Sequence, residues 1–345
     1  MKMIMLKVIG SARFAEHRPP GGHPEQPARA RVMDDVARRF ADAGGEVVEP
    51  RPATRAELER VHASVYVDRI AATAGRSVAL DPDTFTSAES YALALAAAGA
   101  AIEAAAHAAA GHGPGVALVR PPGHHAERDR AMGFCLFNSI AVAAAAARAT
   151  GVDRVAVLDY DVHHGNGTQW MFYEDPTVLY VSLHQYPFYP GTGAVADVGR
   201  EAGAGFTLNV PLEAGAGDAD YDRAMRELVA PVVTAFGPGL LLLSAGFDAH
   251  TRDPLGGMQV GTEGFGRMTG HVQRLAADCC AGRLAVVTEG GYDLTALGSC
   301  LDATLAQLRD GVPPAEGPLA GDTSRVDRVA PAVQAAMRPH WPGVL

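Results

Sequence analysis

The chain has 345 residues, of which 48% are hydrophobic and 20% are charged, a mixture typical of a globular protein with a sizeable core. A net charge of -10 without any Lys/Arg run argues against a nucleic-acid partner. Four cysteines without a C-x-x-C pair, and a first segment without the pattern of a signal peptide, predict a soluble protein of the reducing cytoplasm.

Short apolar runs predict eight strands, at 3–9, 46–49, 116–119, 155–159, 178–182, 206–210, 240–244 and 284–288. The segments between and after them predict helices at 26–43, 88–110, 137–150, 219–235, 262–281, 293–310 and 323–337. Residues 91–110 have the length of a membrane span, but they include Glu103 and His107, so we expect a soluble helix and no membrane contact. This alternation predicts one α/β domain over 1–345, with a mostly parallel sheet flanked by helices.

Five polar segments follow predicted strands: RPPGHH (120–125), DYDVHHGNG (159–167), SLH (182–184), SAGFD (244–248) and TEGGYD (288–293). In open parallel sheets, ligands bind beyond the carboxyl ends of the strands. We therefore expect these segments to meet at one edge of the sheet and to form a single site.

Two acidic residues and one histidine have the pattern of a metal site. Asp161 and His163 are two positions apart, so in an extended segment both side chains point to the same side. Asp248 follows an apolar run, where an unpaired carboxylate is very costly to bury. Three protein ligands leave a position for water, which is typical of a catalytic site and not of a structural one.

A tandem pair of histidines, His124 and His125, is suited to proton transfer near neutral pH. Each imidazole needs an acceptor for its other nitrogen, and Asp159 and Asn166 are the candidates. A capping or surface pair is the alternative, although the preceding Pro-Pro-Gly turn favours a functional loop.

Three aromatic residues lie in loops near the same edge. Tyr292 follows a Gly-Gly pair, and its hydroxyl either donates to a developing oxyanion or is simply packed. Phe134 and Tyr189 either line a narrow channel or belong to the core.

The motifs RPPGHH, GFCLFN, DYDVHHGNGTQ, SLHQYPFYPGTG, SAGFDAHTRDPLGG and TEGGY together resemble the zinc-dependent histone deacetylase family, in particular its class II members and bacterial deacetylase-like amidohydrolases. The resemblance runs from about Met3 to Leu308. It implies the three-layer arginase/deacetylase-like fold with a mostly parallel eight-stranded sheet, and hydrolysis of an acylated amine such as acyl-lysine.

The resemblance also implies a role for each matching position. The zinc ligands would be Asp161, His163 and Asp248. His125 would be the general base with help from His124, and Tyr292 would polarise the acyl carbonyl. Asp159 would pair with His124, and Asn166 stands where class I members have an aspartate. The implied substrate tunnel contains Gly133, Phe134, Tyr189 and Leu255; the implied structural potassium site contains Asp159, Asp161, His163, Ser182 and Leu183; and Arg29 would lie in a channel for the leaving acetate.

The sequence allows three alternatives to an acyl-lysine hydrolase. A binuclear, arginase-like centre needs additional carboxylates where this chain has Gly165 and Gly246, which argues for one metal ion. An acetylpolyamine hydrolase is disfavoured by Leu255 and by the short segment 80–91, unless Glu89 lies at the rim. A binding module without activity is disfavoured because every implied catalytic position is intact.

The expected partner is an acylated lysine peptide, an acylated protein or a small acylated amine. The preferred acyl group, zinc against iron, and assembly into a homo-oligomer stay open.

Overall fold

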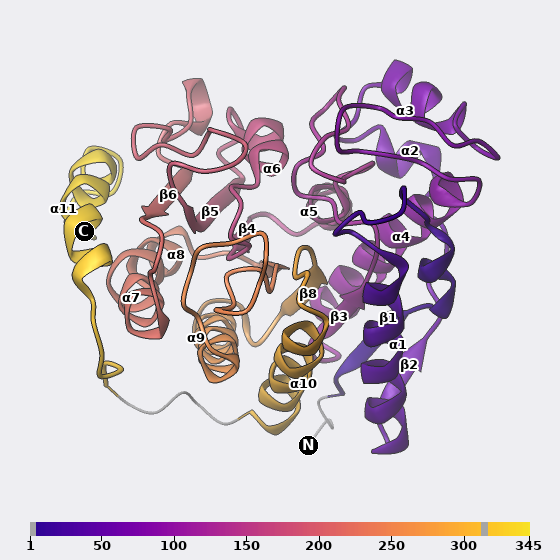
Figure 1. Cartoon of the computed structure of the whole chain (residues 1–345). Coiled ribbons are helices and arrows are strands. Elements are labelled where there is room, and N and C mark those ends of the chain that lie inside the picture. Colours follow the sequence, from indigo (N-terminus) through magenta and orange to yellow (C-terminus); the bar gives the residue numbers. More distant parts are fainter. Residues whose placement is uncertain (1–4, 312–316) are drawn as a thin grey trace.

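The computed structural model describes residues 5–311 and 317–345 and contains a sheet of eight strands with helices on both faces (Figure 1). The strand order is β2-β1-β3-β8-β7-β4-β5-β6, and the paired strands are all parallel. The strands are β1 (Lys7–Gly10), β2 (Glu46–Val48), β3 (Gly115–Leu118), β4 (Val155–Asp159), β5 (Val178–Gln185), β6 (Thr207–Leu212), β7 (Leu240–Ala245) and β8 (Leu284–Thr288).

The helices form the two outer layers of the molecule. One layer consists of α1 (Pro27–Asp42), α7 (Asp218–Ala224), α8 (Ala230–Phe236), α9 (Thr262–Cys280), α10 (Leu294–Asp310) and α11 (Ser324–Met337). The other consists of α2 (Arg55–Leu58), α3 (Ser64–Ala71), α4 (Ser90–Ala109), α5 (Ser139–Ala149) and α6 (Asn166–Phe172). Residues Ala12–Glu16 and Glu201–Gly203 form short 3₁₀ turns.

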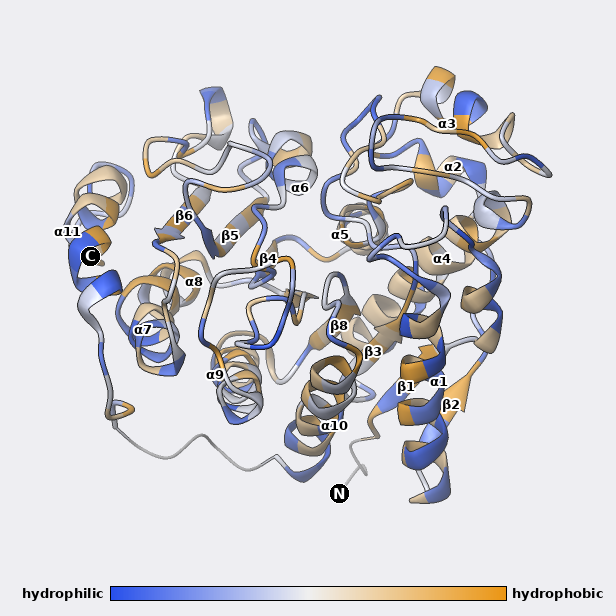
Figure 2. Ribbon diagram, in the orientation of Figure 1, coloured by the Kyte–Doolittle hydropathy of each residue, from blue (hydrophilic) through white to orange (hydrophobic). Residues whose placement is uncertain are grey.

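The central strands are buried on both faces, which explains why their sequences are continuously apolar. In β4, Val155 and Val157 face the core beneath α4 and α5, whereas Ala156 and Leu158 face the core beneath α9 and α10. Helices such as α9 and α10 carry both hydrophobic and hydrophilic residues around their circumference (Figure 2). The two hydrophobic cores therefore lie on opposite sides of the sheet.

Helix α4 is long and apolar enough to cross a membrane by length and composition alone. In this structure 61% of its apolar window is buried, and it packs against α5 and the sheet. Its apolar character is thus explained by its place in the core.

Most predicted elements end within one or two residues of the observed bounds, and the predictions at 3–9 and 219–235 differ more. The strand predicted at 3–9 begins at Lys7 because its neighbour β3 begins opposite it, at Gly115; residues 3 and 4 lie outside the described residues. The helix predicted at 219–235 is interrupted by a π-helical turn, Met225–Val229, between α7 and α8. Pro231 has no N–H to donate to the carbonyl of Glu227, so regular α-helical bonding cannot continue there.

Two local predictions about the polar segments were wrong, and three short helices were missed. Residues 182–184 do not follow β5 but belong to it, because pairing with β6 continues as far as Gln185. Residues 161–163 form a bend after β4, not an extended segment. Helices α2, α3 and α6 lie in stretches for which the sequence predicts neither a helix nor a strand.

The strand order explains why distant polar motifs meet. Strands β3, β8, β7, β4 and β5 are consecutive neighbours, and all of them run in the same direction. The segments that follow β3, β4, β7 and β8, and the last residues of β5, therefore share one edge of the sheet. This is the edge at which the sequence predicts the site.

Candidate active site

The three predicted metal ligands lie together beyond the ends of β4 and β7. One ligand atom from each of Asp161, His163 and Asp248 lies within 4.8 Å of the other two. Nδ1 of His163 is 3.1 Å from Oδ1 of Asp161 and 3.2 Å from Oδ2 of Asp248. The backbone N–H groups of Gly290 and Val162 donate to the remaining oxygens of Asp161 and Asp248, at 2.8 and 2.9 Å. Both carboxylates are therefore held in fixed orientations.

Burial makes this cluster electrostatically demanding. Asp161 and Asp248 are fully buried, and burial together with the nearby Asp161 raises the pKa of Asp248 above its ordinary value. Burial lowers the pKa of His163, but the two carboxylates outweigh it and raise that pKa. Two carboxylates at such a short distance require a positive charge between them, either a proton on His163 or a cation.

Glycines next to this cluster leave no space for further ligands. A Cβ atom on Gly246 would lie 1.9 Å from Oδ2 of Asp161, and a Cβ atom on Gly165 would lie 2.4 Å from Oδ2 of Asp159. A side chain at either place would displace a buried carboxylate. The geometry therefore agrees with a single ion and not with the binuclear, arginase-like alternative.

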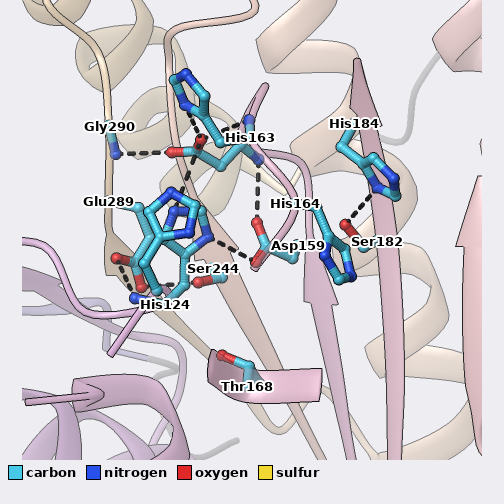
Figure 3. A network of polar contacts seen from close by, with 12 residues as sticks. His124, Asp159, His163, His164, Thr168, Ser182, His184, Ser244, Glu289 and Gly290 are labelled. Carbon is cyan, nitrogen blue, oxygen red and sulfur yellow. Dashed lines mark hydrogen bonds and ion pairs between the residues drawn. The ribbon is translucent and has the colours of Figure 1, made fainter. Parts of the chain in front are cut away.

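His124 is held by two buried carboxylates, one at its ring and one at its backbone. Its Nδ1 donates to Oδ2 of Asp159 at 3.0 Å. Glu289 accepts from the N–H of His124 at 3.1 Å, from that of Gly123 at 2.6 Å and from the Ser244 hydroxyl at 2.8 Å (Figure 3). Burial lowers the pKa of His124, but the nearby aspartates outweigh it and raise that pKa to about 10.

His125 lies in a different environment although it is the next residue. Its Nδ1 is 2.8 Å from Oδ1 of Asn166, the first residue of α6. Burial and the neighbouring imidazoles of His124 and His163 lower its pKa well below the ordinary value. The acceptors predicted from the sequence, Asp159 and Asn166, therefore both make the expected contacts.

Tyr292 contacts Asp253, Phe134 and Arg29. Asp253 accepts from its backbone N–H at 2.6 Å. Its ring packs edge to face against Phe134, with ring centroids 5.8 Å apart. The guanidinium of Arg29 lies 4.8 Å from the ring centroid on another side. Burial raises the pKa of Tyr292 well above its ordinary value, so the hydroxyl stays protonated and is able to donate.

Arg29 belongs to a second group of buried charges behind Tyr292. Its guanidinium donates to the backbone carbonyls of Glu289 and Gly291 and to the Glu25 carboxylate. Arg120 also donates to Glu25, so one carboxylate contacts two buried arginines. Burial alone would raise the pKa of Glu25, but the positive charge of Arg120 and the nearby imidazole of His17 hold it well below its ordinary value.

A cavity of about 440 Å³ opens onto these groups. Its lining includes every residue predicted for the tunnel, namely Gly133, Phe134, Tyr189 and Leu255, together with His125, His163 and Tyr292. A Cβ atom on Gly133 would lie 2.3 Å from the His125 ring, so only glycine allows the wall to approach this histidine so closely. The rings of Phe134, Tyr189 and Tyr292 thus line a cavity that reaches the candidate metal ligand His163.

The rim of the cavity differs from one expectation. Asp83 lines the cavity, whereas Glu89 precedes α4 and lies 3.8 Å from Arg13. The acidic residue to consider at the entrance is therefore Asp83, which the sequence analysis did not single out.

The residues of the implied potassium site are close together. Asp159 pairs with Ser182 across β4 and β5, and Leu183 follows Ser182 in β5. Asp161 and His163 follow the end of β4. The presence of potassium there stays a prediction.

Several functional residues were missed because nothing in their local sequence gives their partners. Glu289 and Arg120 stand in the motifs TEGGY and RPPGHH, which were quoted for other residues, and Glu25 and Asp83 stand outside every quoted motif. A signal was available for Glu289, since a carboxylate directly after an apolar strand is rare unless it is paired.

Comparisons with known proteins agree with this geometry. The histone deacetylase domain family matches residues 23–308. Histone deacetylase 15 of Arabidopsis thaliana is 41% identical over 309 residues, covering 86% of this chain and 55% of that protein. The histone deacetylase-like amidohydrolase of Pseudomonas aeruginosa is 41% identical over 302 residues, covering 84% of this chain and 78% of that protein.

Two further similarities extend this result. The polyamine deacetylase HDAC10 of Homo sapiens is 38% identical over 340 residues, covering 92% of this chain and 49% of that protein. The chain thus spans about half the length of two of these relatives. The crystal structure of the HDA15 HD domain superposes with a TM-score of 0.90 at 37% identity, covering 99% of this chain and 96% of that one. The predicted arginase/deacetylase-like fold is confirmed, and the chain belongs to the histone deacetylase family.

Proposed function

We propose that this protein is a metal-dependent amide hydrolase that removes the acyl group from acylated amines, preferably the acetyl- or acyl-lysine side chains of proteins or peptides. The observation that carries the proposal is the convergence of Asp161, His163 and Asp248 with His125 and Tyr292 at one cavity. The relatives named as deacetylases and as an amidohydrolase support the same class of reaction.

The donor set fits one divalent ion, with Zn²⁺ as the proposed ion. Asp161, His163 and Asp248 would hold it, because their ligand atoms already face one another and the two buried carboxylates need a positive charge. Such an ion supplies Lewis acidity toward the acyl carbonyl and lowers the pKa of water. We also propose K⁺ near Asp159, Asp161, His163, Ser182 and Leu183, supported by the proximity of these residues.

The side chains around the ion have the protonation states that amide hydrolysis requires. His125 is neutral because its pKa is lowered, so it is able to take a proton from the attacking water. The protonated Tyr292 donates to the oxyanion as it develops. His124, whose pKa is raised by the nearby aspartates, would favour the negatively charged transition state in its protonated form. A histidine then protonates the leaving amine.

The shape of the cavity supports a long, unbranched amine on the substrate. Phe134 and Tyr189 provide apolar walls, and Leu255 rather than a carboxylate stands at the predicted rim position. These features favour acyl-lysine. Asp83 in the lining, together with the similarity to the human polyamine deacetylase, supports an acetylated polyamine as the alternative substrate.

The test is a comparison of substrates on the purified, zinc-loaded protein. We expect turnover of a fluorogenic acetyl-lysine peptide, loss of turnover with a chelator and recovery after Zn²⁺ is added back. An N-acetylated polyamine measured by amine release tests the alternative. Binding of the acetyl-lysine peptide without any release of acetate would contradict the hydrolase and support a binding module.

A further inference from the structure

We propose that Glu127 is a positioning residue that orients the amide of Asn166 and thereby fixes which nitrogen of His125 carries the proton. The consequence for catalysis rests on the proposed hydrolase function, whereas the effect on the proton position does not.

A continuous chain of contacts links the solvent to His125 through Glu127. Nδ2 of Asn166 donates to Oε1 of Glu127 at 2.8 Å, and Oδ1 of the same amide is 2.8 Å from Nδ1 of His125. Arg130 donates to the same Glu127 oxygen at 2.9 Å. The Glu127 side chain is 19% exposed, whereas Asn166 and His125 are buried. Glu127 is thus the charged, outermost member of the chain.

The donors and acceptors in this chain allow one arrangement. An ionised carboxylate only accepts hydrogen bonds, so Glu127 requires the NH₂ group of Asn166 to face it. The amide oxygen then faces His125, and Nδ1 must be the nitrogen that carries the proton. The other ring nitrogen, Nε2, is left with its lone pair, which is the form that a general base needs.

A carboxylate in place of Asn166 would impose this tautomer by itself, because it also only accepts. An amide does not, because a rotation of its plane by about 180° exchanges donor and acceptor. Two weaker contacts of Nδ2, to the His125 carbonyl and to Met132 Sδ, are both 3.4 Å long. The short contact to the charged Glu127 therefore dominates the choice of orientation.

The backbone of Glu127 is itself held in place. The carbonyl of Glu127 accepts from Nδ1 of the buried His62 at 3.0 Å, and its N–H donates to the Arg130 carbonyl at 2.9 Å. His62 Nε2 in turn accepts from the N–H of Asn138, the residue before α5. The carboxylate is thus presented to Asn166 from an anchored segment.

The first experiment compares Glu127→Leu, Glu127→Gln and the matched control Asp129→Asn, which changes an exposed acid in the same loop. Glu127→Leu should lower kcat by about tenfold, as for other residues that orient a catalytic imidazole. KM should hardly change, because Glu127 does not line the described cavity. Gln retains an acceptor oxygen and should restore most of the rate.

The direct readout is the position of the proton on His125. In zinc-loaded protein with ¹⁵N-labelled histidine, nitrogen chemical shifts distinguish the Nδ1–H from the Nε2–H tautomer, and the His125 signals are assigned by their loss in His125→Ala. We expect Nδ1–H in the unchanged protein and in Glu127→Gln, and a mixture in Glu127→Leu. A merely structural role would lower stability without changing this ratio.

The second experiment tests whether Glu127→Gln raises kcat when residue 166 is an aspartate. Asn166→Asp places two carboxylates about as close as the present 2.8 Å contact, so we expect impaired turnover. Adding Glu127→Gln to that variant replaces the repulsion with a hydrogen bond and should raise kcat. The same Gln substitution should not raise kcat in the unchanged background.

Three outcomes would overturn the proposal: an unchanged tautomer in Glu127→Leu, equal effects of Glu127→Leu and Asp129→Asn, or additive effects in the double variant. Absence of turnover in the unchanged protein would instead contradict the hydrolase function, and the nitrogen shifts would still decide the role of Glu127.

Discussion

Two groups of buried charges lie close to each other at the carboxyl edge of the sheet, and they are balanced in different ways. The outer group, Asp161, His163 and Asp248, has two acids and one imidazole. The inner group, which we call the arginine cluster, consists of Glu25, Arg29 and Arg120 and is held together by ion pairs. Arg29 packs against the ring of Tyr292, and Tyr292 lines the same cavity as His163 of the outer group.

The difference shows why one group is a site and the other a support. In the arginine cluster the protein itself supplies both signs of charge, and backbone carbonyls accept the remaining guanidinium N–H groups. In the outer group the acids outnumber the bases, so a further positive charge is required. Buried charge alone therefore does not identify a metal site; buried carboxylates that outnumber the cations of the protein do.

The largest expected effect comes from breaking the outer group. Asp248→Ala removes one of three ligands, so we expect the protein to lose its metal and all measurable turnover. Metal content by elemental analysis of the purified variant checks this. Asp129→Ala is the control, and full metal occupancy in Asp248→Ala would remove Asp248 from the ligand set.

A substitution that breaks the ion pairs of the arginine cluster should act mainly on stability and less on activity. Glu25→Gln leaves two buried arginines without their shared counter-charge, and we expect the free energy of unfolding to fall by about 3 kcal/mol. Urea unfolding measures this. Glu174→Gln, which changes an exposed pair with Arg200, should cost less than about 1 kcal/mol. Equal losses would mean that the buried pairs contribute no more than a surface pair.

Tyr292 contacts Arg29 of the arginine cluster and lines the same cavity as His163 of the outer group, so its substitution is the next test. Tyr292→Phe keeps the ring against Arg29 but removes the hydroxyl, so stability and metal content should be preserved. We expect kcat to fall by about 10² to 10³, the range for loss of one oxyanion donor. Steady-state kinetics at saturating metal measure this, and near-normal turnover would show that Tyr292 serves only in packing.

A smaller effect on the free energy of unfolding should come from His62, a buried imidazole that is kept neutral and is not paired with an opposite charge. Burial lowers the pKa of His62 to about 4 from 6.5, and its two nitrogens bond to backbone groups of Glu127 and Asn138. The His62 imidazole binds a proton more tightly in the unfolded chain than in the folded chain. The contribution of the neutral, buried His62 to the free energy of unfolding is therefore complete above pH 6.5 and is lost as the pH falls toward 4. The loss amounts to about 3 kcal/mol at most.

The variant His62→Gln isolates this contribution, because glutamine is also a neutral donor and acceptor but does not titrate. We expect the difference in unfolding free energy between the unchanged protein and His62→Gln to be constant above pH 7. Below pH 6.5 the unfolding free energy of the unchanged protein should fall relative to that of His62→Gln. A difference that does not change between pH 7 and pH 4.5 would show that His62 is accessible to protons in the folded state.

Most of the fold was predictable because burial leaves a direct signature in the sequence. The strands β4 and β8 were predicted with their observed bounds, since continuous apolar runs end where polar site residues begin. Pairing with a neighbour changed the start of β1 and the end of β5, and no local pattern encodes the register of a neighbour.

The site was predictable in its residue types but not in its supports. Asp161, His163 and Asp248 could be grouped because parallel strands deliver their carboxyl ends to the same edge. Glu289 and Glu127 could not be assigned, since their partners are 165 and 39 positions away.

By itself, the sequence determined the order of strands and helices along the chain and the chemical groups at one edge of the sheet, because hydrophobic periodicity and strand direction are properties of consecutive residues. Only the tertiary structure decided that the pKa of His124 is raised while that of the adjacent His125 is lowered. Hydrogen bonds and buried charges act over a few ångströms, and those distances exist only once distant segments are packed together.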